Sequence, residues 1–191
     1  SVLLVPYAIP GFISLLVWSS FYNTEFGLIN TTLGLSIDWF GDPFWAKVAV
    51  LVTNLWMGFP YMFLVCTGAL QAIPSDLKEA ASIDGATGWT NFRKITFPLM
   101  LVAVAPLLVA TFAFNFNNFG AIFLLTEGGP FTPENPTAGA TDILISYTYR
   151  LAFGGTQQIG FASAVTVVLF ILTGIIAALQ FRATKKLEEF S

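Results

Sequence analysis

The chain has no histidine, a single cysteine (Cys66), and only 10% charged residues among its 191. The absence of histidine removes the commonest catalytic base and metal ligand, and one cysteine cannot form a disulfide within the chain. There is no phosphate-binding Gly-Lys-Ser/Thr loop, so we expect the chain itself to hydrolyse no nucleotide. Its eight lysines and arginines form no basic patch, which argues against a nucleic-acid partner.

Charge is absent altogether from four long runs, while hydrophobic residues make up 55% of the chain. A helix needs about 20 mainly apolar residues to cross the hydrocarbon core of a bilayer. The sequence therefore predicts an all-α, polytopic membrane protein in a single transmembrane domain, residues 1–191. The four expected spans are Val2–Tyr22, Ala46–Ile73, Pro98–Leu125 and Ile159–Phe181.

Prolines and polar connections divide the spans. Pro6 and Pro10 predict a kink within the first span. The connection 23–45 has apolar residues spaced for a short helix at the membrane interface, and residues 139–153 of the connection 126–158 predict an amphipathic helix that ends at Gly154. The apolar positions behind these two predictions are Phe26, Leu28, Ile29, Leu33 and Leu35, and Ile143, Leu144, Tyr147 and Leu151.

The distribution of lysine and arginine predicts the orientation of the spans. One side of the predicted membrane receives six of these residues and the other side receives two. The positive-inside rule then places residues 74–97 and the C-terminus in the cytoplasm, and the connections 23–45 and 126–158 outside. The two sets are Lys78, Arg93, Lys94, Arg182, Lys185 and Lys186 against Lys47 and Arg150.

Residues 74–97 form a charged island between the second and third predicted spans. Ser75 can cap a short helix that carries Asp76 and Glu79 in its first turn, near the positive end of the helix dipole. Gly85 is predicted to end this helix, because glycine accepts the left-handed conformation. A second short helix is expected to run to Pro98, with three bulky residues on one side: Trp89, Phe92 and Ile95.

The spacing within the island resembles the cytoplasmic "EAA" loop of ATP-binding-cassette (ABC) importer permeases. Glu79-Ala80-Ala81 is followed after three residues by Gly85, and after nine more by Ile95-Thr96-Phe97-Pro98. Phe97 departs from the family, which usually has leucine there. The resemblance implies that this loop docks into a cleft on a cytoplasmic ATPase, with Glu79, Ala80, Ala81 and Gly85 as coupling residues. An ordinary amphipathic connector is the alternative.

Two predicted spans carry polar stripes on one helical face. Neutral amides are costly in lipid, so both faces are expected to meet protein or a water-filled cavity. Amides and aromatic rings together suit a polyhydroxylated ligand such as a sugar, although the same amides could serve as interhelical hydrogen bonds. The stripe residues are Asn54, Gly58 and Tyr61, and Thr111, Phe114, Asn115 and Asn118; Asn117 lies off the face and is expected to make a structural bond.

Further segments resemble the maltose/maltodextrin branch of these permeases, and within it the larger of the two membrane subunits. They are Phe112–Phe119, the turn Leu125–Pro130, Thr141-Asp142 and Tyr147–Arg150. The resemblance implies that all seven stripe residues line a sugar-binding cavity. A member of this branch has serine where this chain has Thr111.

The resemblance also implies partners and a cellular setting. They are a second permease subunit, an ABC ATPase dimer that binds ATP and Mg²⁺ in place of this chain, an external sugar-binding protein, maltose or maltodextrin, and the lipid bilayer of a bacterial inner membrane. Family members have at least five core spans, so we expect this chain to be a C-terminal part. The alternatives are a permease for another oligosaccharide or trehalose, an ion-coupled sugar carrier, and a membrane anchor or assembly subunit.

Overall fold

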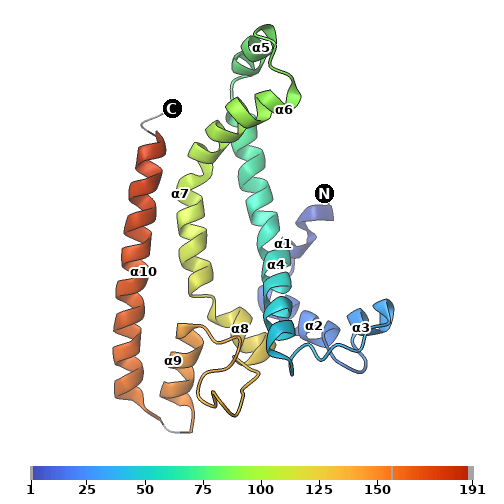
Figure 1. The fold of residues 1–191 in the computed structure, drawn as a ribbon, viewed down its shortest axis with the longest axis vertical. Coiled ribbons are helices and arrows are strands. Elements are labelled where there is room, and N and C mark those ends of the chain that lie inside the picture. Colours follow the sequence, from blue (N-terminus) through green and yellow to red (C-terminus); the bar gives the residue numbers. More distant parts are fainter. Residues whose placement is uncertain (1, 156, 189–191) are drawn as a thin grey trace. The chain divides into compact units, whose positions relative to one another are not determined.

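The computed structural model describes residues 2–155 and 157–188, and over these residues it is helical, without a β-strand (Figure 1). The prediction of an all-α fold is confirmed. The chain divides into two compact units. One comprises the residues up to Pro60 together with Phe116–Leu172, and the other comprises Tyr61–Asn115 together with the chain from Thr173 on. Neither unit is a continuous stretch of sequence.

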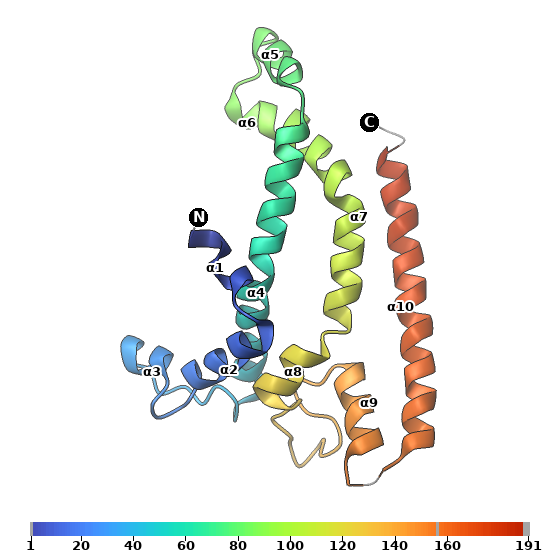
Figure 2. The same cartoon turned by 180° about the vertical axis from the view of Figure 1, so that it is seen from behind.

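The first unit is organised around the packing of α2 against α8 (Figures 1 and 2). Leu15 of α2 is buried against Ala121 and Leu125 of α8, and Trp18 and Met57 cover this cluster. The helices that lie wholly in this unit are η1 (Val2–Leu4), α1 (Val5–Ala8), α2 (Gly11–Phe21), α3 (Leu28–Leu33), α8 (Phe119–Thr126) and α9 (Leu144–Phe153).

The connection 23–45 is a folded segment with its own core. The Tyr22 side chain is 2% exposed and packs with Trp39 and Ala49, and its hydroxyl donates to the Ala49 carbonyl at 3.1 Å. The buried Asn30 amide donates to the Ile37 carbonyl at 2.8 Å and accepts from the Trp39 indole at 2.9 Å. The short helix predicted here is present as α3.

The second unit contains the charged island and the helix that follows it. Its elements are the part of α4 (Pro43–Ala72) from Tyr61 on, α5 (Ser75–Ile83), α6 (Gly88–Asn91), the π-helical turn η2 (Phe92–Thr96), α7 (Phe97–Phe116), and the last part of α10 (Ile159–Glu188). Contacts of α5 with both α6 and η2 hold the island together.

Three helical stretches among the described residues are long and apolar enough to cross a membrane: Pro43–Ala72, Gly88–Thr126 and Ile159–Thr184. In their apolar windows only 17%, 11% and 11% of the residues are buried within the chain. Apolar surface on this scale must be covered by lipid or by other protein subunits. The helical extents therefore agree with three of the four predicted spans.

The first predicted span is interrupted. Val2–Ala8 and Gly11–Phe21 are bent by 107° relative to each other, so this segment is a span only if the bent pair counts as one. The kink expected at the prolines is present, and it is large enough to divide the segment into two helices. Ile9, which precedes Pro10, has extended backbone angles (φ −92°, ψ 131°). A residue before proline is biased away from the helical region, and the helix ends there.

The ends of the other spans also differ from prediction. Pro98 lies inside continuous helix instead of separating two helices, and η2 directly precedes it: the Phe97 N–H bonds to the Phe92 carbonyl, a π-type bond. This widened turn lies where the ring of Pro98 would meet the Lys94 carbonyl of a regular helix. At the C-terminus α10 continues past Phe181 to Glu188, because the charged residues that follow are good helix formers.

Candidate functional site

The N-terminus of α5 differs from the predicted cap. The helix begins at Ser75 itself, Pro74 occupies the N-cap position, and no side chain caps the helix. The Ser75 hydroxyl instead bonds to the Asp76 carboxylate at 3.3 Å. The predicted serine cap was wrong by one position, because the extended backbone of Pro74 (φ −55°, ψ 135°) already provides the non-helical residue that precedes the helix.

The predicted elbow at Gly85 is present. Gly85 has φ +80°, the left-handed conformation. Its N–H bonds to the Ser82 carbonyl at 3.1 Å, and the Ala86 N–H bonds to the Ala81 carbonyl at 2.9 Å. These two bonds are the Schellman arrangement, which satisfies carbonyls that the end of a helix leaves unpaired. A side chain at Gly85 would be strained, so this turn requires glycine at this position.

The four predicted coupling residues lie on one short helix and its elbow, but they do not share one environment. Glu79, Ala80 and Gly85 are exposed. Ala81 is 6% exposed and packs inside the second unit. The exposed part of the motif is therefore Glu79, Ala80 and Gly85, while Ala81 lies inside the loop and its carbonyl accepts a hydrogen bond from Ala86.

The side-chain amide of Asn91 connects the two helical parts of residues 74–97, which are α5 on one side and α6 with η2 on the other. The Asn91 Nδ2 donates to the Lys78 carbonyl of α5 at 3.3 Å, and its Oδ1 lies 3.5 Å from the Thr96 hydroxyl of η2. Thr96 is 8% exposed. Beyond this bridge the rings of Trp89 and Phe92 stack with centroids 5.6 Å apart, on the same side as predicted for these residues.

Of the predicted sugar-binding residues, the structure brings Asn54 and Asn118 together in the first unit. The Asn118 Nδ2 donates to the Asn54 Oδ1 at 3.0 Å. Asn118 is not on the α7 face, as the periodicity predicted, but is the N-cap of α8, where its Oδ1 accepts from the Ala121 N–H at 3.4 Å. The helix breaks at Asn117 and Asn118 because asparagine side chains compete for backbone hydrogen bonds and favour caps.

The remaining predicted residues are arranged as follows. Thr111, Phe114 and Asn115 lie on α7 of the second unit, where the Asn115 amide donates to the Thr111 carbonyl at 2.9 Å and Phe114 is 70% exposed. Gly58 belongs to the first unit, with open space where a Cβ would be. Tyr61, one turn further along α4, belongs to the second unit.

We expect Asn118→Ala to destabilise the start of α8 by about 1–2 kcal/mol, the usual cost of removing an N-cap. Asn118→Asp keeps the cap acceptor but loses the amide donor to Asn54, so it should cost less at α8. Amide hydrogen exchange of residues 119–122 in the purified protein measures both effects. Equal protection in wild type and Asn118→Ala would contradict the capping role.

The connection 126–158 contains a polar hub that the sequence pattern did not predict. Arg150 of α9 forms an ion pair with Asp142, whose side chain is 5% exposed. Arg150 also donates to the Thr137 carbonyl at 3.0 Å and to the Glu127 carbonyl at 3.2 Å. Asp142 accepts from the Gly139 N–H at 2.7 Å and from the Ser146 hydroxyl at 2.9 Å. The available signal was that Arg150 is the one basic residue in this connection.

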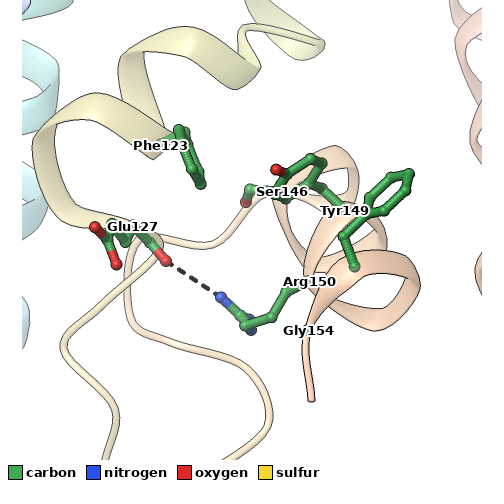
Figure 3. A pocket seen from close by; sticks show the side chains of 7 residues that line it. Phe123, Glu127, Ser146, Tyr149, Arg150 and Gly154 are labelled. Carbon is green, nitrogen blue, oxygen red and sulfur yellow. Dashed lines mark hydrogen bonds between the residues drawn. The ribbon is translucent and has the colours of Figure 1, made fainter. Parts of the chain in front are cut away.

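A pocket of about 160 Å³ lies beside this hub, between the end of α8 and α9 (Figure 3). Phe123, Tyr149 and Phe153 supply aromatic surface, and the Phe123 and Tyr149 rings are 5.3 Å apart in an edge-to-face arrangement. Figure 3 shows the Arg150 guanidinium directed to the Glu127 carbonyl, where it covers the C-terminal end of α8. The aromatic rings and this hydrogen bond fix α9 against α8.

Among the residues that the structure describes, no group of three His, Cys, Asp or Glu side chains could hold a metal ion. The features that remain are those of a membrane subunit: long apolar helices with exposed surfaces, a charged helical loop, and amides within apolar helices. The family described as binding-protein-dependent transport system inner membrane component matches residues 1–185. The chain belongs to this family.

Its curated relatives include permeases for one class of sugar. The maltose/maltodextrin transport system permease protein MalF of Vibrio parahaemolyticus is 52% identical over 96% of this chain. The MalF proteins of Vibrio cholerae and Salmonella typhimurium are 53% and 48% identical over the same share. The chain spans only 36% or 37% of the length of these relatives.

Solved structures support the fold. A bacterial alginate ABC transporter, in complex with its alginate pentasaccharide-bound periplasmic protein, matches 95% of this chain and 62% of its own with a TM-score of 0.80 at 24% identity. A second structure, of a bacterial ABC transporter involved in the import of alginate, gives a TM-score of 0.75 at 21% identity over 95% of this chain and 63% of its own. The predicted fold of an ABC importer transmembrane domain is confirmed.

Proposed function

We propose that this chain is part of the permease subunit of an ATP-driven, binding-protein-dependent importer of maltose or maltodextrins. The observation that carries the proposal is the 52% identity to a MalF protein over 96% of the chain. The polar and aromatic residues in the helices support a sugar as cargo, since amides bond hydroxyls and rings pack on the apolar faces of a pyranose.

The work would be divided among several subunits. The exposed part of α5 engages a cytoplasmic ATPase, which binds ATP and Mg²⁺ and forms a dimer. A second permease subunit completes the pathway across the bacterial inner membrane, and an external sugar-binding protein delivers the cargo. The excess of lysine and arginine in residues 74–97 and in the C-terminal segment supports a cytoplasmic position for both.

The sugar pathway is proposed to include the seven stripe residues. In this proposal the amides of Asn54, Asn115 and Asn118 bond hydroxyl groups of the sugar, and Tyr61 and Phe114 pack on its ring faces. The bonds that Asn115 and Asn118 make with the Thr111 carbonyl and with Asn54 support this role, because they hold the amides in fixed directions. A polar group held in advance loses less entropy when it binds a ligand.

The experiment uses the full-length parent assembled with its second permease, ATPase and binding protein. ATP hydrolysis in nanodiscs is followed against a panel of sugars, and uptake is followed in liposomes. Maltose or maltodextrin should stimulate hydrolysis and be taken up only with ATP. If only trehalose or another oligosaccharide stimulates hydrolysis, that sugar replaces maltose as the assigned substrate. Uptake that follows an imposed sodium or proton gradient and ignores ATP would exclude the importer.

In the same assay we expect Asn115→Ala to reduce sugar uptake about tenfold, which corresponds to about 1.4 kcal/mol of lost binding. The comparison requires that the complex stay assembled, which is checked on the purified variant. Asn117→Ala is the matched control, since it removes an amide next to the proposed face. An Asn115→Ala complex that transports normally but is less stable would indicate that these amides only join helices.

A further inference from the structure

We propose that Asn91 is the positioning residue that makes α5 and the base of α7 move together, so that motion of the docked helix reaches the membrane. This inference rests on the proposed function and deepens it. The docking residues say where an ATPase would bind. They do not explain how a displacement of α5 is transmitted to α7. The contacts within residues 74–97 indicate how this happens.

The covalent connection between α5 and α6 is too flexible to transmit a displacement of α5 to α7 by itself. It consists of the residues between Ile83 and Gly88, with Gly85 in the left-handed conformation. A glycine turn of this kind can change its backbone angles with little steric resistance. If this connection were the only link between α5 and α6, α5 could rotate at Gly85 while α7 did not move.

Packing of α5 against α6 and η2 adds little resistance to a rotation of α5 at Gly85. Within α5, whose residues are all described, Ala81 is the buried one, and it contributes a single methyl group. The larger apolar side chains of the island point outward: Ile83 is 87% exposed and Trp89 is 71% exposed. The interior of this loop is therefore small, and a specific polar contact has a large share in holding its geometry.

Asn91 makes that contact. Its amide donates across the loop to the Lys78 carbonyl at 3.3 Å. Its carbonyl oxygen faces the Thr96 hydroxyl at 3.5 Å, in the π-helical turn that leads without a break into α7. An amide has a donor and an acceptor on one rigid plane, so one side chain can join two helical segments. Figure 2 shows α5 and α6 as two short helices joined by the loop that this contact spans.

The bridge formed by Asn91 ends in the turn η2, directly before α7. A single π turn contains one more residue than an α turn, and such turns are frequent at functional sites. Thr96 lies at the end of this turn and is almost fully buried. A displacement of α5 that pulls on the Lys78 carbonyl is thus transmitted through Asn91 to the point where α7 begins.

The test measures the number of sugar molecules imported per ATP hydrolysed, with the full-length complex in liposomes. Asn91→Leu keeps the approximate shape and removes both polar groups, and Asn91→Asp keeps the acceptor and removes the donor. Asn91→Asp should lower this ratio about fivefold, the factor expected for the loss of about one hydrogen bond, and Asn91→Leu should lower it at least as much. The ATPase should stay bound in both variants, because the exposed Glu79 and Ala80 are unchanged.

Two further variants separate transmission from stability. Ser82→Ala is the matched control: the Ser82 hydroxyl bonds to the same Lys78 carbonyl at 2.9 Å, but within one helix, so the ratio should stay at the wild-type value. Thr96→Val removes the second arm of the bridge without changing shape, and it should lower the ratio in the same direction as Asn91→Leu.

The outcomes are distinct. A wild-type ratio in both Asn91 variants, an equal loss in Ser82→Ala, or release of the ATPase in place of uncoupling would overturn the role of Asn91. In each of these cases the wild-type complex still imports sugar with ATP, so the proposed function stands. If the wild-type complex itself shows no ATP-driven uptake, the proposed function fails first.

Discussion

Arg150→Met is expected to lower the free energy of opening of the connection 126–158 by about 3 kcal/mol, the lower end of the range for removing one partner of a buried ion pair. The Asp142 carboxylate would remain almost fully buried without its cation. The Thr137 and Glu127 carbonyls would lose their donor as well. The lower end applies because the Arg150 side chain is itself 30% exposed.

Hydrogen exchange of the amides in residues 128–142 measures this opening. Protection should fall about hundredfold, since 1.4 kcal/mol corresponds to a factor of ten. Adding Asp142→Asn to the methionine variant should recover part of the loss, because it removes the buried charge while the Gly139 N–H keeps an acceptor. Unchanged protection in Arg150→Met would mean that the ion pair does not hold this connection.

Glu79→Lys is expected to reduce ATP-driven uptake at least about tenfold, within the range of typical coupling energies between sites. Glu79 is exposed on α5, and its carboxylate has no hydrogen-bonding or ionic partner among the described residues. The change therefore alters the charge presented to a docked ATPase while the fold of the loop is retained.

Uptake and ATP hydrolysis by the full-length complex measure this effect. Glu25→Lys is the control, because it makes the same charge reversal at an exposed acidic residue in the connection 23–45, on the side expected to face away from the ATPase. Equal transport by wild type and Glu79→Lys would contradict a coupling role and would indicate that residues 74–97 only connect two helices.

The features that could be predicted from the sequence depend on local chemistry. Gly85 ends α5 with the expected left-handed backbone, and Gly154 ends α9 as the glycine pair indicated. The apolar runs predicted the three long helices, though not their ends, because a charge-free segment of sufficient length has few alternatives in a membrane. The positions of Glu79 and Ala80 on an exposed helix follow from the same kind of pattern.

The features that could not be predicted depend on contacts between distant segments. Pro10 indicates a disturbance of the helix, but the 107° bend also reflects the packing of Leu15 against α8. Periodicity alone put Asn118 on the face of α7, whereas its amide bonds to Asn54, 64 residues away, and caps α8. The bond between Asn91 and Lys78 joins positions that no helical spacing relates.

The core around Tyr22 has a consequence for the order of folding during synthesis. Its hydrogen bonds to Ala49 and Thr53 join residues separated by 27 and 31 positions, and Asn30 and Trp39 are 9 positions apart. All of these contacts lie within residues 22–53, and chains fold from the N-terminus as they are made. Residues 22–53 can therefore fold before α8 has been synthesised. The face of α2 around Leu15 is then covered by α8 only after Ala121 and Leu125 have been synthesised.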